Sequence, residues 1–257
     1  MNTFDTYVIN LDKDTDRLKQ ITYNLSPNLF TRIPGVYGNA LNTDEYNEIL
    51  YTSKHFMPKS AIGCAMSHRK AIQTFMNTSN KPYALILEDD AVPLTKHYME
   101  EVADAIKNAP SDWNIIKLDY NPKYNIPYYH RLFTITATAY IINKPGAEKF
   151  LRQPVIYHID VDMNFYDLKM YNNPKVLFDQ VWDENNHSNN RIYSLYNPLN
   201  CIHEGINYKM VRILGVEYTA ADLVLYLLIL VLIIVLWVHR VDKYIVKLLR
   251  LPKFNVK

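Results

Sequence analysis

Short apolar runs alternate with amphipathic stretches along most of the chain. Tyr7–Leu11 and Tyr83–Leu87 are brief and almost wholly apolar, which is typical of buried strands. Apolar residues recur at helical spacing from Ser60 to Met76. A polar turn at Asp12–Arg17 is predicted to start a helix that runs to about Leu25. Further helices are predicted over Lys96–Asn108 and from Pro145 to Leu151, and β-rich segments at Trp113–Tyr120 and Phe133–Ile142. Strands that alternate with helices indicate an α/β domain with a mainly parallel sheet.

A hydrophobic segment near the C-terminal end breaks this alternation. Leu223–Val238 is an uninterrupted run of sixteen apolar residues, and extension back to Tyr218 adds Asp222 as the one charged residue. A membrane span needs about 20 apolar residues, so we expect a transmembrane or membrane-inserted helix at 218–238. The alternative is a core helix that is buried on all sides. Basic residues at helical spacing follow, which predicts a basic amphipathic tail at 239–257.

Charge is distributed unevenly along the chain. The net charge is +2, but residues 239–257 carry six Lys and Arg against Asp242, a net of +5, which leaves −3 for the rest. A weakly acidic domain lacks the signature of a nucleic-acid-binding protein, so nucleic acid is not an expected partner. The basic excess beside the apolar segment favours membrane lipid instead. No basic and apolar leader is visible at the start, so we expect a single-pass or tail-anchored protein whose domain faces the cytosol.

Glycine and cysteine are both scarce, with 6 and 2 residues, and neither G-x-G-x-x-G nor the Walker pattern occurs. A nucleotide diphosphate would therefore need another counter-charge, and a divalent metal held by carboxylates is the obvious one. Cys64 and Cys201 are too few for a disulfide framework or a Cys-based zinc site.

The first candidate site is the acidic end of the Tyr83–Leu87 strand. Glu88, Asp89 and Asp90 follow it directly, and ligands bind at the carboxyl ends of strands in α/β sheets. Three adjacent carboxylates repel one another unless a cation offsets the repulsion. The alternatives are a solvated acidic turn, or Asp90 as a helix cap.

Two further segments carry candidate chemistry. Alternation along an extended stretch would point Asp160 and Asp162 the same way, where they could contact a metal or act as a general base; the alternative is a surface turn. In the predicted helix, Ser67 and His68 share a small face with Cys64 and Ala71. His68 could approach a ligand there, although a lone helical histidine is more often a structural hydrogen-bonding residue.

Together these segments resemble glycosyltransferase family 25, the lipopolysaccharide and collagen β-galactosyltransferase group. The matching segments, in order across roughly residues 5–195, are Val8–Asp12 with Arg17, Gly63–His68, Leu87–Ala91, Ala137–Tyr140, Lys144–Ala147 and Asp160–Asp162.

The resemblance implies a GT-A-type Rossmann-like fold for residues 1–216, a UDP-sugar donor, a divalent metal (Mn²⁺ or Mg²⁺) and inversion at the anomeric carbon. The residues it implies are Asn10, Leu11, Arg17, Ser67, His68 and Glu88 for the donor, Asp89 and Asp90 for the metal, and Asp160 and Asp162 near the reaction centre. His203 is a candidate late metal ligand.

The expected activity is therefore transfer of galactose, or of glucose, to a hydroxyl of a glycan, glycolipid or glycoprotein at a membrane. Two alternatives stay open. Metal-dependent phosphodiester hydrolysis also uses clustered carboxylates, but it usually needs histidines among them, and Glu88–Asp90 has none nearby. A non-catalytic, membrane-anchored protein that binds a nucleotide-sugar is the other. The tyrosines Tyr120, Tyr124, Tyr128 and Tyr129 are a candidate platform for the acceptor sugar. The acceptor's identity and the oligomeric state are left open by the sequence.

Overall fold

The computed structural model describes residues 3–41, 47, 49–119, 126–180 and 206–238. The chain divides into two compact units, Met1–Asn190 and Arg191–Lys257. The predicted metal ligand His203 and the predicted basic tail at 239–257 lie outside the described residues.

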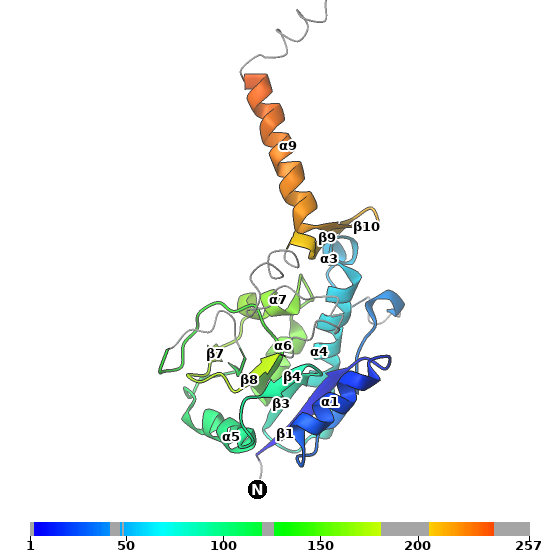
Figure 1. Cartoon of the computed structure of the whole chain (residues 1–257). Coiled ribbons are helices and arrows are strands. Elements are labelled where there is room, and N and C mark those ends of the chain that lie inside the picture. The colour runs from blue at the N-terminus through cyan, green and yellow to red at the C-terminus, as the bar shows by residue number, and fades with distance from the viewer. Residues whose placement is uncertain (1–2, 42–46, 48, 120–125, 181–205, 239–257) are drawn as a thin grey trace, which may run out of the picture. The chain divides into compact units, whose positions relative to one another are not determined.

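The first unit alternates strands and helices (Figure 1). Its elements are β1 (Phe4–Asn10), α1 (Thr15–Leu25), β2 (Thr31–Pro34), the short 3-10 helix η1 (Gly38–Ala40), α3 (Tyr51–Phe56), α4 (Lys59–Thr78), β3 (Tyr83–Glu88), β4 (Ala91–Pro93), α5 (Tyr98–Asn108), β5 (Ile115–Lys117), β6 (Ala139–Asn143), α6 (Lys144–Arg152), α7 (Ile159–Phe165), β7 (Met170–Asn172) and β8 (Phe178–Gln180).

Six of these strands form the central sheet in the order β2-β1-β3-β6-β5-β7. The pairs β1–β2, β1–β3 and β5–β7 are parallel, whereas β6 is antiparallel to both of its neighbours, β3 and β5. The prediction of an α/β domain with a mainly parallel sheet is confirmed, with β6 as the single reversed strand of this sheet. A separate two-stranded pair joins β4 to β8.

Helices cover both faces of the sheet, because side chains along a strand alternate between faces. On β3, Leu85 and Leu87 pack into the core formed with α1 and α5. Ala84 and Ile86 pack on the opposite face with α4, α6 and α7. A strand buried on both faces must be apolar at every position, which explains the continuous apolar run from the sequence.

Most of the predicted elements are confirmed, including the helices that become α1, α4, α5 and α6. The prediction for the segment around Asp160 and Asp162 is wrong. The stretch around Asp160 and Asp162 is not extended but forms helix α7, because the carbonyl of His158 accepts hydrogen bonds from the amides of Val161 and Asp162.

In the second unit, an antiparallel hairpin precedes a long helix. The hairpin joins β9 (Lys209–Ile213) to β10 (Val216–Thr219), and α9 (Ala220–Val238) follows at once. By length and composition α9 could cross a membrane, and none of its residues is buried. Tyr218 and Thr219, which were predicted to begin the apolar helix, belong to β10 instead. The predicted end of the enzymatic domain at residue 216 falls inside this second unit, so that boundary stays a prediction.

Candidate active site

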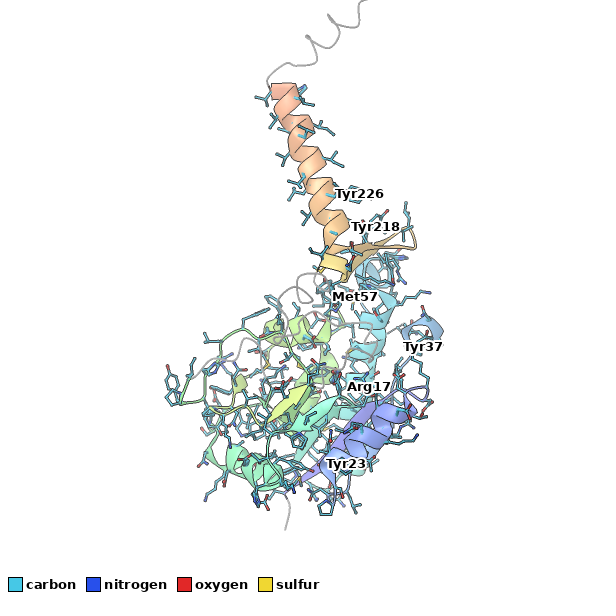
Figure 2. The ribbon with its side chains drawn as sticks, viewed as in Figure 1. Arg17, Tyr23, Tyr37, Met57, Tyr218 and Tyr226 are labelled. Atoms are coloured by element: carbon cyan, nitrogen blue, oxygen red, sulfur yellow. The ribbon has the colours of Figure 1, made fainter. Side chains whose placement is uncertain are left out.

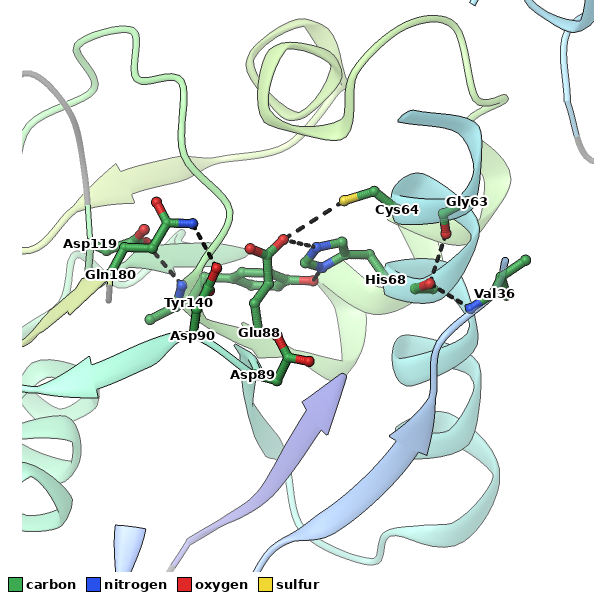
Figure 3. Close-up of polar contacts among 12 residues, drawn as sticks. Val36, Gly63, Cys64, His68, Glu88, Asp89, Asp90, Asp119, Tyr140 and Gln180 are labelled. Atoms are coloured by element: carbon green, nitrogen blue, oxygen red, sulfur yellow. Dashed lines mark hydrogen bonds and ion pairs between the residues drawn. The ribbon is translucent and has the colours of Figure 1, made fainter. Parts of the chain in front are cut away.

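The site is built at the carboxyl end of β3, where the strand stops being apolar. Alternation along β3 puts Glu88 on the same face as Ala84 and Ile86, which is the face covered by α4. Asp89 and Asp90 follow in a turn, and both are buried. The three consecutive carboxylates therefore reach different neighbours, although they are adjacent in sequence (Figure 3).

Glu88 is held by side chains of α4. His68 Nε2 lies 3.1 Å from Glu88 Oε1, and the Cys64 thiol donates to the same oxygen at 3.7 Å. His68 Nδ1 lies 3.1 Å from the Tyr140 hydroxyl on β6. When Glu88 is ionised it accepts from Nε2–H, so Nδ1 must accept from Tyr140 O–H. The two ring nitrogens of His68 thus link Glu88 on β3 to Tyr140 on β6.

Burial dominates the ionisation of this group. It lowers the pKa of His68 to about 4, so the imidazole is neutral at pH 7. Burial, with Asp90 as the next contributor, raises the pKa of Glu88 to about 8. The ligand atoms of Cys64, His68 and Glu88 all lie within 4.8 Å of one another, close enough to share a metal ion. This mixed set of sulfur, nitrogen and oxygen suits a softer metal than Mg²⁺.

Asp89 and Asp90 are bridged by one cation, Arg17 of α1. Arg17 contacts Asp89 Oδ1 at 2.8 Å and also pairs with Asp90 Oδ2 (Figure 2 labels Arg17). Asn10, at the end of β1, donates to Asp89 Oδ2 at 2.7 Å, and Gln180 of β8 donates to Asp90 at 3.0 Å. Arg17 supplies the positive charge that the adjacent carboxylates need, and Asn10 orients one of them.

The carboxylates at this sheet edge suit a hard divalent cation. Asp90 Oδ1 is buried and has no hydrogen-bond partner among the described residues. Burial raises the pKa of Asp89 to about 7 despite Arg17. Carboxylate oxygens are the ligands that Mg²⁺ and Mn²⁺ prefer. The predicted metal residues Asp89 and Asp90 therefore lie side by side, and they fit such an ion.

Sequence reasoning missed a second buried layer of charge, Lys117 and Asp119, at the end of β5. Lys117 is completely buried, and its Nζ has no hydrogen-bond partner among the described residues. Burial lowers its pKa, while Asp119, Asp160 and Glu88 act to raise it. Burial raises the pKa of Asp119, which accepts a hydrogen bond from the Ala139 amide at 3.0 Å. The signal was present in the sequence, because Lys117 and Asp119 place charges at alternate positions of the predicted β-rich segment Trp113–Tyr120.

The carboxylates of Asp160 and Asp162 have different surroundings in the structure. Asp160 lies in the first turn of α7, and burial followed by the charge of Glu88 raises its pKa to about 7. Asp162 instead accepts hydrogen bonds from the amides of Ile156 and Tyr157, at 2.9–3.0 Å. Two positions along a helix differ by about 200° around its axis, so the two side chains cannot face the same way. The structure joins Asp160 to the carboxylate cluster electrostatically and uses Asp162 to hold the loop before α7.

Ser67 is also committed to the fold. Its hydroxyl accepts from the Val36 amide at 2.8 Å and donates to the Gly63 carbonyl at 2.7 Å. A Cβ on Gly63 would lie 2.6 Å from the Val36 carbonyl oxygen and 2.7 Å from the Gly38 amide nitrogen, so α4 packs here backbone against backbone. The position predicted for the donor is thus a packing contact that places His68 and Cys64.

The predicted nucleotide residues at the end of β1 are arranged by Arg32. Its guanidinium donates to Asn10 Oδ1 at 3.0 Å and to the Asn10 carbonyl at 3.2 Å, and it pairs with Asp12 at 2.5 Å. Leu11 follows Asn10 and is half-buried, and its amide nitrogen would lie 3.3 Å from a Cβ on Gly35. Asn10 and Arg17 thus meet the acidic end of β3.

The fold and site define an α/β protein whose carboxylates gather at the carboxyl edge of a mainly parallel sheet. A family described as glycosyltransferase family 25 (LPS biosynthesis protein) matches residues 4–134, just over half of the chain. The chain belongs to glycosyltransferase family 25, and its class of activity is glycosyl transfer. The matched region contains Asn10, Arg17, Glu88–Asp90 and Lys117, and it ends before Asp160.

Three solved structures show a distant likeness to this chain. A197 from STIV has a TM-score of 0.43 at 10% identity, over 70% of this chain and 86% of that one. A glycosyltransferase involved in glycosylation of the major capsid of PBCV-1 has a TM-score of 0.38 at 11% identity, over 57% and 62%. A Drosophila β-1,4-galactosyltransferase 7 mutant in complex with manganese, UDP-Gal and xylobiose has a TM-score of 0.34 at 8% identity, over 70% and 71%. No curated protein matches the sequence. These values are too low to transfer the role of any residue.

Proposed function

We propose that this protein is a metal-dependent, inverting hexosyltransferase that moves galactose from a UDP-sugar to a hydroxyl of a glycan, glycolipid or glycoprotein at a membrane. The observation that carries the proposal is the charge imbalance at the sheet edge. Five linked carboxylates (Glu88, Asp89, Asp90, Asp119 and Asp160) face two cations, Arg17 and Lys117, among the described residues. Such an excess of buried negative charge suits a divalent cation that a diphosphate also binds.

Asp89 and Asp90 would hold the metal, with Glu88 beside them. The ion would supply positive charge against the diphosphate as the bond to the sugar breaks. Arg17 already contacts both aspartates, so its guanidinium lies where a phosphate oxygen could share it. Asn10 fixes Asp89 from the end of β1, the edge at which α/β sheets bind nucleotides.

Asp160 is our choice for the general base. A base must accept the proton of the acceptor hydroxyl as that oxygen attacks the anomeric carbon, and a pKa near the working pH is best suited to this. Burial and Glu88 bring the pKa of Asp160 to about 7. We prefer Asp160 to Asp162 for this role, because the amides of Ile156 and Tyr157 donate to the carboxylate oxygens of Asp162.

Lys117 would keep part of the Asp160 population ionised. Its ammonium favours the charged form of Asp160, while Glu88 opposes it. Lys117 is completely buried, and pairing of β5 with β6 and β7 fixes its position. We assign Lys117 as a positioning residue that acts through Asp160.

Membrane attachment through α9 completes the proposal. Its exposed apolar surface supports insertion into lipid, which would keep the enzyme near a glycolipid or membrane glycan acceptor. We keep the expectation of a domain on the cytosolic side. Of the four candidate acceptor tyrosines, Tyr120 and Tyr124 lie outside the described residues, whereas Tyr128 is exposed and Tyr129 donates to the Ala105 carbonyl.

A panel of UDP-sugars tests the proposal. The full chain in lipid vesicles is incubated with UDP-galactose, UDP-glucose, UDP-N-acetylglucosamine and UDP-glucuronate, with Mn²⁺ or with excess chelator, and UDP release is measured. We expect selective release from UDP-galactose that needs the metal. Binding of UDP without turnover of any sugar would support the non-catalytic alternative. Equal turnover in chelator would contradict the metal assignment.

A further inference from the structure

The β9–β10 hairpin of the second unit ends in an exposed apolar tip. Ile213, Leu214 and Val216 are 41%, 98% and 55% exposed, and Gly215 is the one other residue at the tip. Residues at hairpin turns are commonly Gly, Asn, Asp or Ser, because these favour the turn and remain solvated. Three apolar side chains at one turn need a different explanation.

The conformation of the turn makes Leu214 more unusual. Ile213 pairs with Val216, so the loop has two residues, and both have positive φ, 52° at Leu214 and 83° at Gly215. This is the signature of a type I′ turn, in which Asn-Gly is strongly preferred. A residue with a Cβ is disfavoured at positive φ. The chain therefore places a large apolar residue where turn chemistry favours a small polar one and where the side chain meets almost no other protein atoms. A residue that conflicts with the preference of its turn in this way is expected where the residue has a function.

The hairpin is tied to the start of α9 by three kinds of contact. Thr219 and Asp222 cap the helix reciprocally, with the Thr219 amide donating to Asp222 Oδ2 at 2.8 Å and the Asp222 amide donating to Thr219 Oγ1 at 3.2 Å. The Ala220 amide donates to the Tyr208 carbonyl at 3.0 Å. The Tyr218 and Tyr226 rings lie 6.0 Å apart (Figure 2). The hairpin therefore lies beside the first turns of α9.

We propose that the tip Ile213–Val216 is a second, shallow contact with the bilayer that α9 enters. The proposal rests on the membrane attachment that forms part of the proposed function. A lipid surface is the partner favoured by continuity, because the exposed apolar tip and the exposed apolar helix belong to one unit and are joined through β10. In the stem of the hairpin Lys209 and Glu217 pair at 2.6 Å, and Met210, Val211 and Tyr218 are half-buried, so the exposed apolar side chains of the hairpin lie at its end.

A shallow contact has a function that α9 alone cannot supply. A single helix leaves the attached protein free to rotate about the helix axis and to tilt. A second contact beside the helix fixes the orientation of the hairpin against the membrane plane. Segments of this kind insert their apolar side chains about 5–10 Å into the boundary between headgroups and acyl chains.

Site-directed labelling of the full chain tests the proposal. Single cysteines are introduced as Leu214→Cys, Leu29→Cys or Leu230→Cys in a chain that also carries Cys64→Ser and Cys201→Ser. Each protein is labelled with an environment-sensitive fluorophore and reconstituted into vesicles of three parts phosphatidylcholine to one part phosphatidylglycerol. Quenching by lipids with a spin label at a shallow or a deep acyl position is then measured. Leu29 is the matched water-exposed control, because it is a leucine of the first unit with 93% exposure. Leu230, in the middle of α9, reports the anchor.

We expect the shallow label to quench position 214 at least about twofold more than position 29, as for an interfacial segment. The deep label should quench position 230 most strongly. Leu214→Asn, which suits the turn better, should reduce shallow quenching of a fluorophore at Val216→Cys. Quenching of position 230 with none at position 214 would overturn the hairpin contact and leave the anchor intact. Absence of quenching at both positions would overturn the hairpin contact and the membrane attachment together, and the donor assay would still stand as a separate test of transfer.

Discussion

The two acidic segments look alike in the sequence but are used differently in the structure. Glu88–Asp90 follows a buried strand and delivers three carboxylates to one sheet edge, where Arg17, Asn10 and His68 hold them. The Asp160–Asp162 segment forms a short helix, which turns its two carboxylates apart. Asp160 joins the first cluster electrostatically, and Asp162 binds the backbone of the preceding loop. A pair of acidic residues therefore indicates a site only once the secondary structure beneath it is known.

Asp90→Asn should cause the largest loss. It removes a negative ligand from the proposed metal site and also half of the Arg17 bridge. Loss of about 4 kcal/mol of charge stabilisation corresponds to a decrease of about 10³-fold in transfer. UDP binding in the presence of Mn²⁺ should fall in parallel, which calorimetry would measure. Gln180→Ala, which removes only the neutral partner of Asp90, is the control and should lose much less. Full activity in Asp90→Asn would remove it from the metal site.

Asp160→Asn should lower transfer by about 10²-fold or more, the usual scale for loss of a general base. UDP binding with Mn²⁺ should stay within about twofold of the unsubstituted protein, because we place Asp160 on the acceptor side. The pH dependence supplies a second readout. The base must be ionised to act, so transfer by the unsubstituted protein should rise with pH through about 7, the pKa of Asp160. At Mn²⁺ concentrations that saturate the metal site at every pH, Asp160→Asn should lose that rise.

Asp162→Ala should change stability more than catalysis. It leaves the amides of Ile156 and Tyr157 without their acceptor, at a cost of about 1–3 kcal/mol in the free energy of unfolding. Denaturant titration would measure this loss. In the folded variant, kcat should remain within about threefold of the unsubstituted value, since no step is assigned to Asp162. An unchanged unfolding free energy would contradict the loop assignment.

Stabilisation by Mn²⁺ should be the smallest effect and should increase with pH. A metal binds the ionised carboxylates, so below the folded-state pKa of about 8 for Glu88 and about 7 for Asp89 it must displace protons. We expect Mn²⁺ to raise the unfolding temperature by about 2–4 °C at pH 8.5 and by less at pH 5.5. Calorimetric scans with Mn²⁺ and with chelator measure the difference. Equal shifts at the two pH values, or the same shift in Asp90→Asn, would place the ion elsewhere.

The sequence predicts the parts of this site that depend on local pattern. The apolar run of β3 stops at Glu88, and its position at a carboxyl sheet edge follows from that stop. The helical spacing that puts His68 on the same face as Cys64 is also local. The hydrogen-bond partners of His68 do not follow from local pattern, because they come from β3 and β6.

Contacts between segments that are far apart in the sequence explain why the charged neighbours of Lys117 and the helix α7 were not predicted. Lys117 meets its charged neighbours only because β5 lies beside the reversed strand β6 and near α7. In the α7 segment, Ile159 and Val161 alternate with aspartates, which favours a strand over so short a stretch. The hydrogen bonds from the amides of residues 161 and 162 to His158, together with the bonds of Asp162 to the preceding loop, select the helix instead.

The measurement that bears most directly on this account is transfer from UDP-galactose by Asp160→Asn and Asp162→Ala, assayed side by side. Each assay uses saturating Mn²⁺ at pH 8 and a temperature at which both variants are folded, and UDP affinity is measured in the same samples. We predict matching UDP affinities, a decrease of about 10²-fold in kcat for Asp160→Asn, and near-normal kcat for Asp162→Ala. The reverse order, with Asp162→Ala inactive while folded and Asp160→Asn active, would contradict the assignment of the base and the division of labour between the two aspartates.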